Sequence, residues 1–188
     1  MTSPNPYAID TDTLSGMKPL RKVVYSIGSN LGDRLSNLQG AVDALRDTPD
    51  VIVVDVSSVY ETAAVGGPED SPAFLNIVLV AETTLEPRTL LERAQAVEDA
   101  YGRDRSGGRW SARTLDVDLI LVGKTELTQP DLTLPHPLAG ERGFVLVPWA
   151  EVDPNGRLPG RQETVGELAA VVDVTGVTRR DDLSVESD

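Results

Sequence analysis

The alternation of apolar and polar positions along the chain predicts elements in the order strand, helix, strand, strand, helix, strand. Clusters of β-branched and aromatic residues favour strands, and apolar residues that recur every three or four positions favour helices. We therefore expect four strands and two helices: strands over 23–27, 51–60, 73–81 and 115–121, and helices beginning after Asp33 and at Pro87.

This order is the split βαβ pattern, and it predicts an α+β fold, a ferredoxin-like βαββαβ sandwich. Right-handed crossovers would place the first and third strands at the centre of the sheet and both helices on one face. The opposite face would then be left for loops and a ligand. Beyond Gly123 we expect an added C-terminal hairpin, in which Leu127 faces 132–134, and short helices within 144–150 and 165–172.

Shifts in composition divide the chain into three parts. Residues 1–20 hold three prolines and few large apolar side chains, so we expect a disordered N-terminal arm. Residues 21–172 would form a single domain, because a chain of 188 residues is long enough for one core and short for two. Residues 173–188 would be a polar C-terminal tail that frays.

The charge balance limits the partners of the chain. A net charge of −13 argues against a nucleic-acid partner, because a phosphate backbone is bound by a basic face. No apolar run approaches the roughly 20 residues of a membrane span, and the first residues lack the order of a signal peptide. The lack of cysteine and the single histidine exclude thiolate and multi-histidine metal sites. We expect a cytoplasmic monomer that acts on small molecules.

The last predicted strand carries two aspartates, Asp116 and Asp118. Strand side chains alternate, so both carboxylates point to one face about 6–7 Å apart, close enough to share one or two hard cations. A solvated pair of acids is the alternative. It is disfavoured because Ile120 lies on the same face and the opposite face is apolar, with Leu115, Val117, Leu119 and Leu121.

A basic loop precedes this strand. It holds four arginines within eleven residues, with only Asp104 against them: Arg103, Arg105, Arg109 and Arg113. Guanidinium groups bind phosphate oxygens, and Gly107-Gly108 would let the loop close over them. Trp110 could cover an aromatic ring or pack against an arginine. Carboxylates for a metal beside arginines for phosphate indicate phosphoryl transfer.

For several other polar residues, a ligand contact and an ordinary structural role are both possible interpretations. Asn76 could match the edge of a heterocycle while Phe74 stacks on it, or it could simply satisfy backbone groups. His136, between two prolines, fits a rigid turn as well as a ligand contact. Gln95 and Glu98, three residues apart on the second helix, could be ordinary surface residues.

Two apparent nucleotide motifs fail on spacing. Gly123-Lys124-Thr125 resembles the end of a P-loop, but Asp118 stands where that motif needs glycine. The glycines of 28–32 lack the G-x-G-x-x-G order of a dinucleotide-binding turn.

Taken together, these residues resemble the hydroxymethyl-dihydropterin pyrophosphokinase family of the folate pathway. The resemblance covers about residues 22–155. It is carried by six blocks, of which R-T-L-D-V-D and L-T-L-P-H are the most specific: 27–33, 60–62, 74–76, 109–118, 132–137 and 142–146. The chain departs from the family's common pattern at Ala63, Ala64, Ala112, Asp131 and Pro137.

The resemblance implies a reaction, its co-substrate and its metal. The β,γ-pyrophosphoryl group of ATP would pass to the hydroxymethyl oxygen of 6-hydroxymethyl-7,8-dihydropterin, releasing AMP, with two magnesium ions on Asp116 and Asp118. Arg103 and Arg113 would neutralise the transferring group. The resemblance also implies the remaining contacts to ATP, which are Gln95, Glu98, Arg105, Arg109, Trp110, Leu119, Thr133, His136 and Arg142. The pterin pocket would consist of Thr62, Val65, Phe74, Asn76, Trp110 and Phe144.

Two other functions are weighed against this one. Nucleotidyltransferases combine a Gly-Ser turn with D-x-D about a dozen residues later, whereas Ser29 and Asp116 are 87 residues apart here. A ferredoxin-like regulatory module would bind a metabolite without chemistry, and it needs no pair of inward acids beside four arginines.

Overall fold

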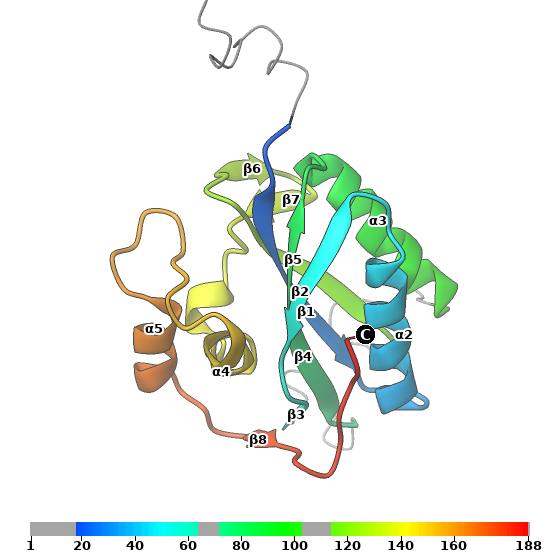
Figure 1. Ribbon diagram of the computed structural model, residues 1–188. Coiled ribbons are helices and arrows are strands. Elements are labelled where there is room, and N and C mark those ends of the chain that lie inside the picture. The colour runs from blue at the N-terminus through cyan, green and yellow to red at the C-terminus, as the bar shows by residue number, and fades with distance from the viewer. Residues whose placement is uncertain (1–17, 64–71, 103–113, 188) are drawn as a thin grey trace, which may run out of the picture.

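The computed structural model describes residues 18–63, 72–102 and 114–187 (Figure 1). The predicted N-terminal arm lies outside these residues, apart from 18–20, and stays a prediction. The strands of the main sheet are β1 (Arg21–Ser29), β2 (Val51–Val56), β3 (Tyr60–Thr62), β4 (Phe74–Thr83), β5 (Asp116–Val122) and β8 (Val177–Arg179).

The main sheet is antiparallel, with the order β5-β1-β4-β3-β8, and β2 also pairs with β4. The first and third expected strands, β1 and β4, are central as predicted. The second expected strand is divided into β2 and β3. The division follows from Ser57, whose Oγ accepts a hydrogen bond from the Val78 N–H at 2.9 Å.

Two helices cover one face of the sheet (Figure 1): α2 (Arg34–Arg46) and α3 (Pro87–Ala100). Asp33 begins α2 as predicted, because its Oδ1 accepts a hydrogen bond from the Ser36 N–H at 3.2 Å. Just past the end of α3, Gly102 has a φ of 75°, the left-handed conformation that glycine adopts without strain. Leu38, Leu90 and other apolar residues of these helices pack with Ile27, Ile77 and Leu119 in a first core.

The opposite face is partly covered by a second core, so it is not left to loops and a ligand alone. This core packs Val24, Val78 and Trp149 together and is built on α4 (Gly143–Val152) and α5 (Val165–Val171). Leu121, which was expected to face the helices with Leu119, belongs to this second core. The register between β1 and β5 shifts at this point, and such a bulge reverses the side to which the following residue points.

The chain continues from β5 into a small hairpin and a short helix. The predicted hairpin is formed by β6 (Leu127–Gln129) and β7 (Leu132–Leu134), followed by the short 3-10 helix η2 (Ala139–Glu141). No helix within the described ranges is long and apolar enough to cross a membrane.

The C-terminal segment corrects the expectation of a fraying tail. Val177–Arg179 pairs with β3, and Leu183 and Val185 pack against the first core. The sequence pattern misled because the few apolar residues of this segment are widely spaced, whereas its main-chain groups find partners on a strand far away in the sequence. The division of the chain at 21 and 172 stays a prediction.

The packing of the sheet predicts that substituting a buried isoleucine lowers the free energy of unfolding far more than substituting an exposed one. Ile77→Ala, in the central strand β4 where Ile77 is 0% exposed, should lower the free energy of unfolding by about 2–5 kcal/mol. Ile52→Ala, in β2 where Ile52 is 55% exposed, should change it by less than about 1 kcal/mol. Urea denaturation followed by circular dichroism measures both, and equal losses would contradict the packing described.

Candidate active site

A row of residues crosses the sheet on the face opposite α2 and α3. Gly28 on β1 lies opposite Asp116 on β5 and also opposite Asn76 on β4, which in turn lies opposite Tyr60 on β3. Directly opposed residues of antiparallel strands point to the same face. The structure therefore brings together one of the two predicted metal ligands and the predicted heterocycle contact, two strand spacings or about 10 Å apart.

The two aspartates lie on this face as predicted. Asp116 is opposite Gly28 and Asp118 is opposite Ser26, and both side chains are half-buried. The intervening Val117 points to the helices and belongs to the first core. The alternation predicted for this part of the strand is therefore confirmed.

The strand that carries these acids is held from the helix side. Glu98 of α3 is 7% exposed, and its Oε2 accepts a hydrogen bond from the Val117 N–H at 2.9 Å. Asn37 of α2 donates from Nδ2 to the Thr114 carbonyl at 3.2 Å and to the Leu31 carbonyl at 3.0 Å. β5 is the edge strand of the sheet and pairs only with β1. These side-chain contacts therefore add a second support at the start of β5.

The donor set of this strand suits a hard cation. Carboxylate oxygens are the preferred ligands of magnesium, which usually completes its shell with water and substrate phosphates. Asp116 and Asp118 offer such oxygens from one rigid face. No group of three or more histidine, cysteine, aspartate or glutamate side chains gathers for a metal within the described part of the chain.

His136 lies within electrostatic range of Asp118. Its backbone N–H donates to the Ile120 carbonyl at 2.8 Å, and its Nδ1 accepts from the Leu138 N–H at 3.2 Å. Burial lowers the pKa of His136, and the charge of Arg142 lowers it further, while Asp118 acts in the opposite direction. A lowered pKa favours the neutral imidazole, and because Nδ1 accepts a hydrogen bond, the neutral form carries its proton on Nε2, which is then a donor.

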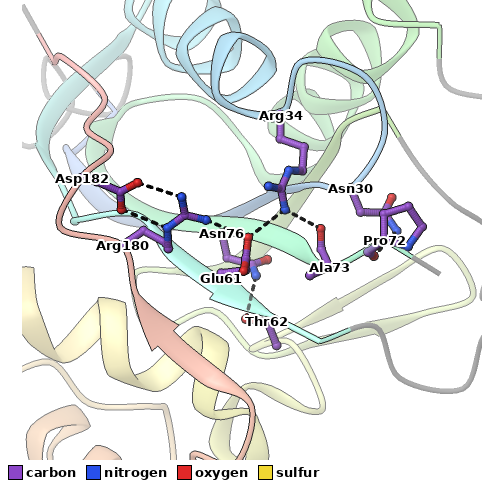
Figure 2. Close-up of polar contacts among 9 residues, drawn as sticks. All are labelled: Asn30, Arg34, Glu61, Thr62, Pro72, Ala73, Asn76, Arg180 and Asp182. Carbon is purple, nitrogen blue, oxygen red and sulfur yellow. Dashed lines mark hydrogen bonds and ion pairs between the residues drawn. The ribbon is translucent and has the colours of Figure 1, made fainter. Parts of the chain in front are cut away.

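On the other side of Gly28, a buried amide faces the same surface. Asn76 is 4% exposed and donates from Nδ2 to Thr62 Oγ1 at 2.9 Å, as Figure 2 shows. Among the described residues, one N–H and the amide oxygen of Asn76 have no other partner and can form further hydrogen bonds. Gly28 permits this arrangement, because a Cβ there would lie 2.8 Å from Asn76 Oδ1 and 3.3 Å from Phe74 Cδ1.

Two predicted residues come from the start of α4. The Arg142 guanidinium lies 5.4 Å from the centroid of the Phe144 ring, within the range of a cation–π interaction. Phe144 is half-buried and packs against the second core. The contact keeps a cationic group and an aromatic ring together at the start of α4.

Four further predicted ATP contacts come from β5, α3 and β7. Leu119 is buried in the first core, on the helix side of the sheet, and Glu98 bonds to the backbone of β5 as described. Gln95 is exposed on α3, and Thr133 is half-buried on β7. Asp131 pairs with Arg88 at 2.5 Å, which holds the pKa of Asp131 below its usual value.

Six predicted residues lie outside the described residues and stay predictions: Val65, Arg103, Arg105, Arg109, Trp110 and Arg113.

Sequence reasoning missed the residues that support the site. Asn37 lies one turn before Ala41 and two turns before Leu45, on the buried stripe of α2, and a polar residue there is a usable signal. Glu61 accepts from both Arg34 and Arg180, and no local pattern links these three residues.

Comparisons with known proteins agree on one family. The family profile described as 7,8-dihydro-6-hydroxymethylpterin-pyrophosphokinase (HPPK) matches residues 24–154. The 2-amino-4-hydroxy-6-hydroxymethyldihydropteridine pyrophosphokinase of Mycobacterium tuberculosis is 47% identical over 149 residues, which cover 74% of this chain and 76% of the relative. The protein of the same name from Synechocystis is 40% identical over 154 residues, which cover 82% and 77% of the two chains.

Solved structures show the same fold at low identity. A triple mutant of Plasmodium falciparum HPPK-DHPS with pteroate superposes with a TM-score of 0.65 at 13% identity, and the match covers 88% of this chain. This chain spans about half of that longer protein, with a coverage of 48%.

The profile spans both sides of the residue row described above, from β1 to the end of α4, and the curated relatives are named pyrophosphokinases, which are transferases. The chain belongs to the 7,8-dihydro-6-hydroxymethylpterin-pyrophosphokinase family.

Proposed function

We propose that the chain transfers the β,γ-pyrophosphoryl group of ATP to the hydroxymethyl oxygen of 6-hydroxymethyl-7,8-dihydropterin and releases AMP, a step of folate biosynthesis. The observation that carries the proposal is the row Asp116–Gly28–Asn76, which sets a carboxylate and a buried amide on one face of the sheet. A polyphosphate at one end and a pterin at the other would meet above Gly28.

The donor half of the site would bind ATP. Asp116 and Asp118 would hold two magnesium ions, which when bound neutralise phosphate charge and orient the triphosphate. The Nε2–H of His136 and the Arg142 guanidinium supply donors for phosphate or ribose oxygens. Gln95, Thr133 and the backbone of Leu119 complete the proposed ATP contacts.

Glu98 has a different proposed part on the donor side. Its carboxylate holds the Val117 N–H, so it fixes the position of the strand between the two aspartates. We propose that it acts at least partly through that strand.

The acceptor half would bind the pterin. Asn76 can both donate and accept, which matches the mixed edge of the pterin ring, and Thr62 fixes the orientation of its amide. Phe74 and Phe144 would lie against the two faces of the bicycle. Gly28 would lie beneath the pterin, because glycine has no Cβ to fill the space beside Asn76 and Phe74.

Pyrophosphoryl transfer requires mainly that the two substrates are positioned and that the phosphate charge is neutralised. The acceptor oxygen attacks the β-phosphorus, the bond from that phosphorus to the α-phosphate oxygen breaks, and the leaving AMP keeps that oxygen. No covalent intermediate on a side chain is needed. Arg103 and Arg113, which lie outside the described residues, would neutralise the transferring group, with Arg105, Arg109 and Trp110 beside them and Val65 in the pterin pocket.

We also propose that the fold is ferredoxin-like. The order β5-β1-β4, with β2 also beside β4, and the two helices on one face support this. The cytoplasmic monomer stays a prediction.

One prediction of the proposed function concerns the reaction itself. With ATP, magnesium and the pterin, the protein should form AMP and pterin pyrophosphate in equal amounts, and a chelator should abolish both. Asp116→Asn and Asp118→Asn should each lower kcat by about 100-fold or more, because each removes a charged ligand. Chromatographic separation of AMP from ADP measures all of these.

The matched control is Asp55→Asn, which changes an exposed aspartate on β2 and should leave kcat unchanged. Formation of ADP, or AMP release that does not need the pterin, would overturn the proposed function.

Another prediction concerns Gly28, at the base of the proposed pterin pocket. Gly28→Ala should raise the KM for the pterin about tenfold, because the added methyl displaces the Asn76 amide and the Phe74 ring. The KM for ATP should change less than twofold, and thermal unfolding controls for stability. An unchanged KM for the pterin would remove Gly28 and Asn76 from the pocket.

A further inference from the structure

The C-terminal strap, residues 177–186, lies outside the residues that the family profile matches, which end at 154. In Figure 1 it runs from β8, beside β3, to a position next to α2. It therefore joins the acceptor side of the sheet to the helix layer.

The strap is paired along its first part with β3. Val177 lies opposite Thr62 and Arg179 opposite Tyr60, and the Arg180 N–H donates to the Val59 carbonyl at 2.8 Å. With only three residues, β3 is short for a strand. The strap gives it a partner on the side away from β4.

The far end of the strap is anchored on α2. The side-chain amide of Gln39 makes two hydrogen bonds with the backbone of Glu186, from Nε2 to the carbonyl at 2.9 Å and from the N–H to Oε1 at 2.8 Å. Leu183 and Val185 pack against the first core between these ends. The strap is thus fixed at both ends.

One side chain of the strap reaches the site's supporting residues. The Nη1 of Arg180 lies 2.9 Å from Glu61 Oε2, the same oxygen that Arg34 Nη1 meets at 3.0 Å, and Asp182 binds the rest of the Arg180 guanidinium (Figure 2). Arg34 also donates to the Ala73 carbonyl at 2.9 Å. The three charged side chains are about 30% exposed, so solvent screens them only in part.

These contacts act on the two strands that carry the acceptor residues. Glu61 and Thr62 are neighbours on β3 and point to opposite faces, and Thr62 Oγ1 holds the amide of Asn76. Ala73 directly precedes Phe74 at the start of β4. Arg34 and Arg180, by sharing one carboxylate oxygen, tie the start of β4 to β3 and the strap.

We propose that Arg180 is a positioning residue for the acceptor site: through Glu61 and Arg34 it sets where β3 holds Thr62 and Asn76, so the strap tunes affinity for the pterin. This inference rests on the proposed function. Arg180 does not touch the substrate in it, and its action passes through β3.

The test is a set of steady-state measurements of AMP release. Arg180→Ala should raise the KM for the pterin about threefold to tenfold, with kcat and the KM for ATP within twofold of wild type. Arg180→Lys should recover part of the loss. Arg157→Ala, which removes an exposed positive charge away from the strap, should match wild type.

A second variant tests the same contact independently, in case Arg180→Ala folds poorly. Glu61→Gln removes the shared acceptor charge and should give a similar rise in the KM for the pterin. The double variant should raise the KM for the pterin no more than the more impaired single variant does, because both substitutions break one network. Hydrogen exchange should show faster exchange at the β3 amides in each variant.

The outcomes separate the two proposals. Wild-type protein that releases no AMP overturns the proposed function and this inference with it. An active wild type, with an unchanged KM for the pterin in both variants, overturns this inference alone. A parallel loss of kcat and of affinity for both substrates also overturns it, because that pattern marks a purely structural role.

Discussion

The register of β1 between its two neighbours is the constraint on which the candidate site depends. Gly28 lies opposite Asn76 on one side and Asp116 on the other, so one small residue separates the two polar groups. A shift of one residue in either pairing would turn Asp116 or Asn76 toward the helices, because strand side chains alternate. The apolar residues on the helix face, such as Ile27, Ile77 and Val117, make that shift costly by burial.

Support for this face comes from beyond its own strands. At the donor edge, Glu98 holds β5 and Asn37 holds Thr114, two residues before β5, from the helix layer. At the acceptor edge, the C-terminal strap and Arg180 hold β3. The strands on either side of the central pair are therefore each held by side chains from outside that pair, which contact the backbone of β5 or the half-buried carboxylate of Glu61.

The sequence predicted what alternation and helical periodicity determine. It placed Asp116 and Asp118 on one face of their strand and Phe74 with Asn76 on one face of another strand, and it found the helix stripes of α2 and α3. It failed where a local pattern is broken or a partner is remote. The bulge that turns Leu121, the Ser57 contact that divides β2 from β3 and the Arg180–Glu61 pair, which spans 119 residues, leave no periodic trace.

The central claim is that one face of the sheet binds both substrates, on the two sides of Gly28. A crystal structure with magnesium, the pterin and α,β-methylene-ATP, whose carbon bridge replaces the oxygen at which the bond breaks, tests it most directly. We predict the triphosphate on Asp116 and Asp118 and the pterin against Asn76, with the β-phosphorus facing the hydroxymethyl oxygen above Gly28. A pterin bound on the helix side of the sheet, or a triphosphate away from the two aspartates, would contradict the account.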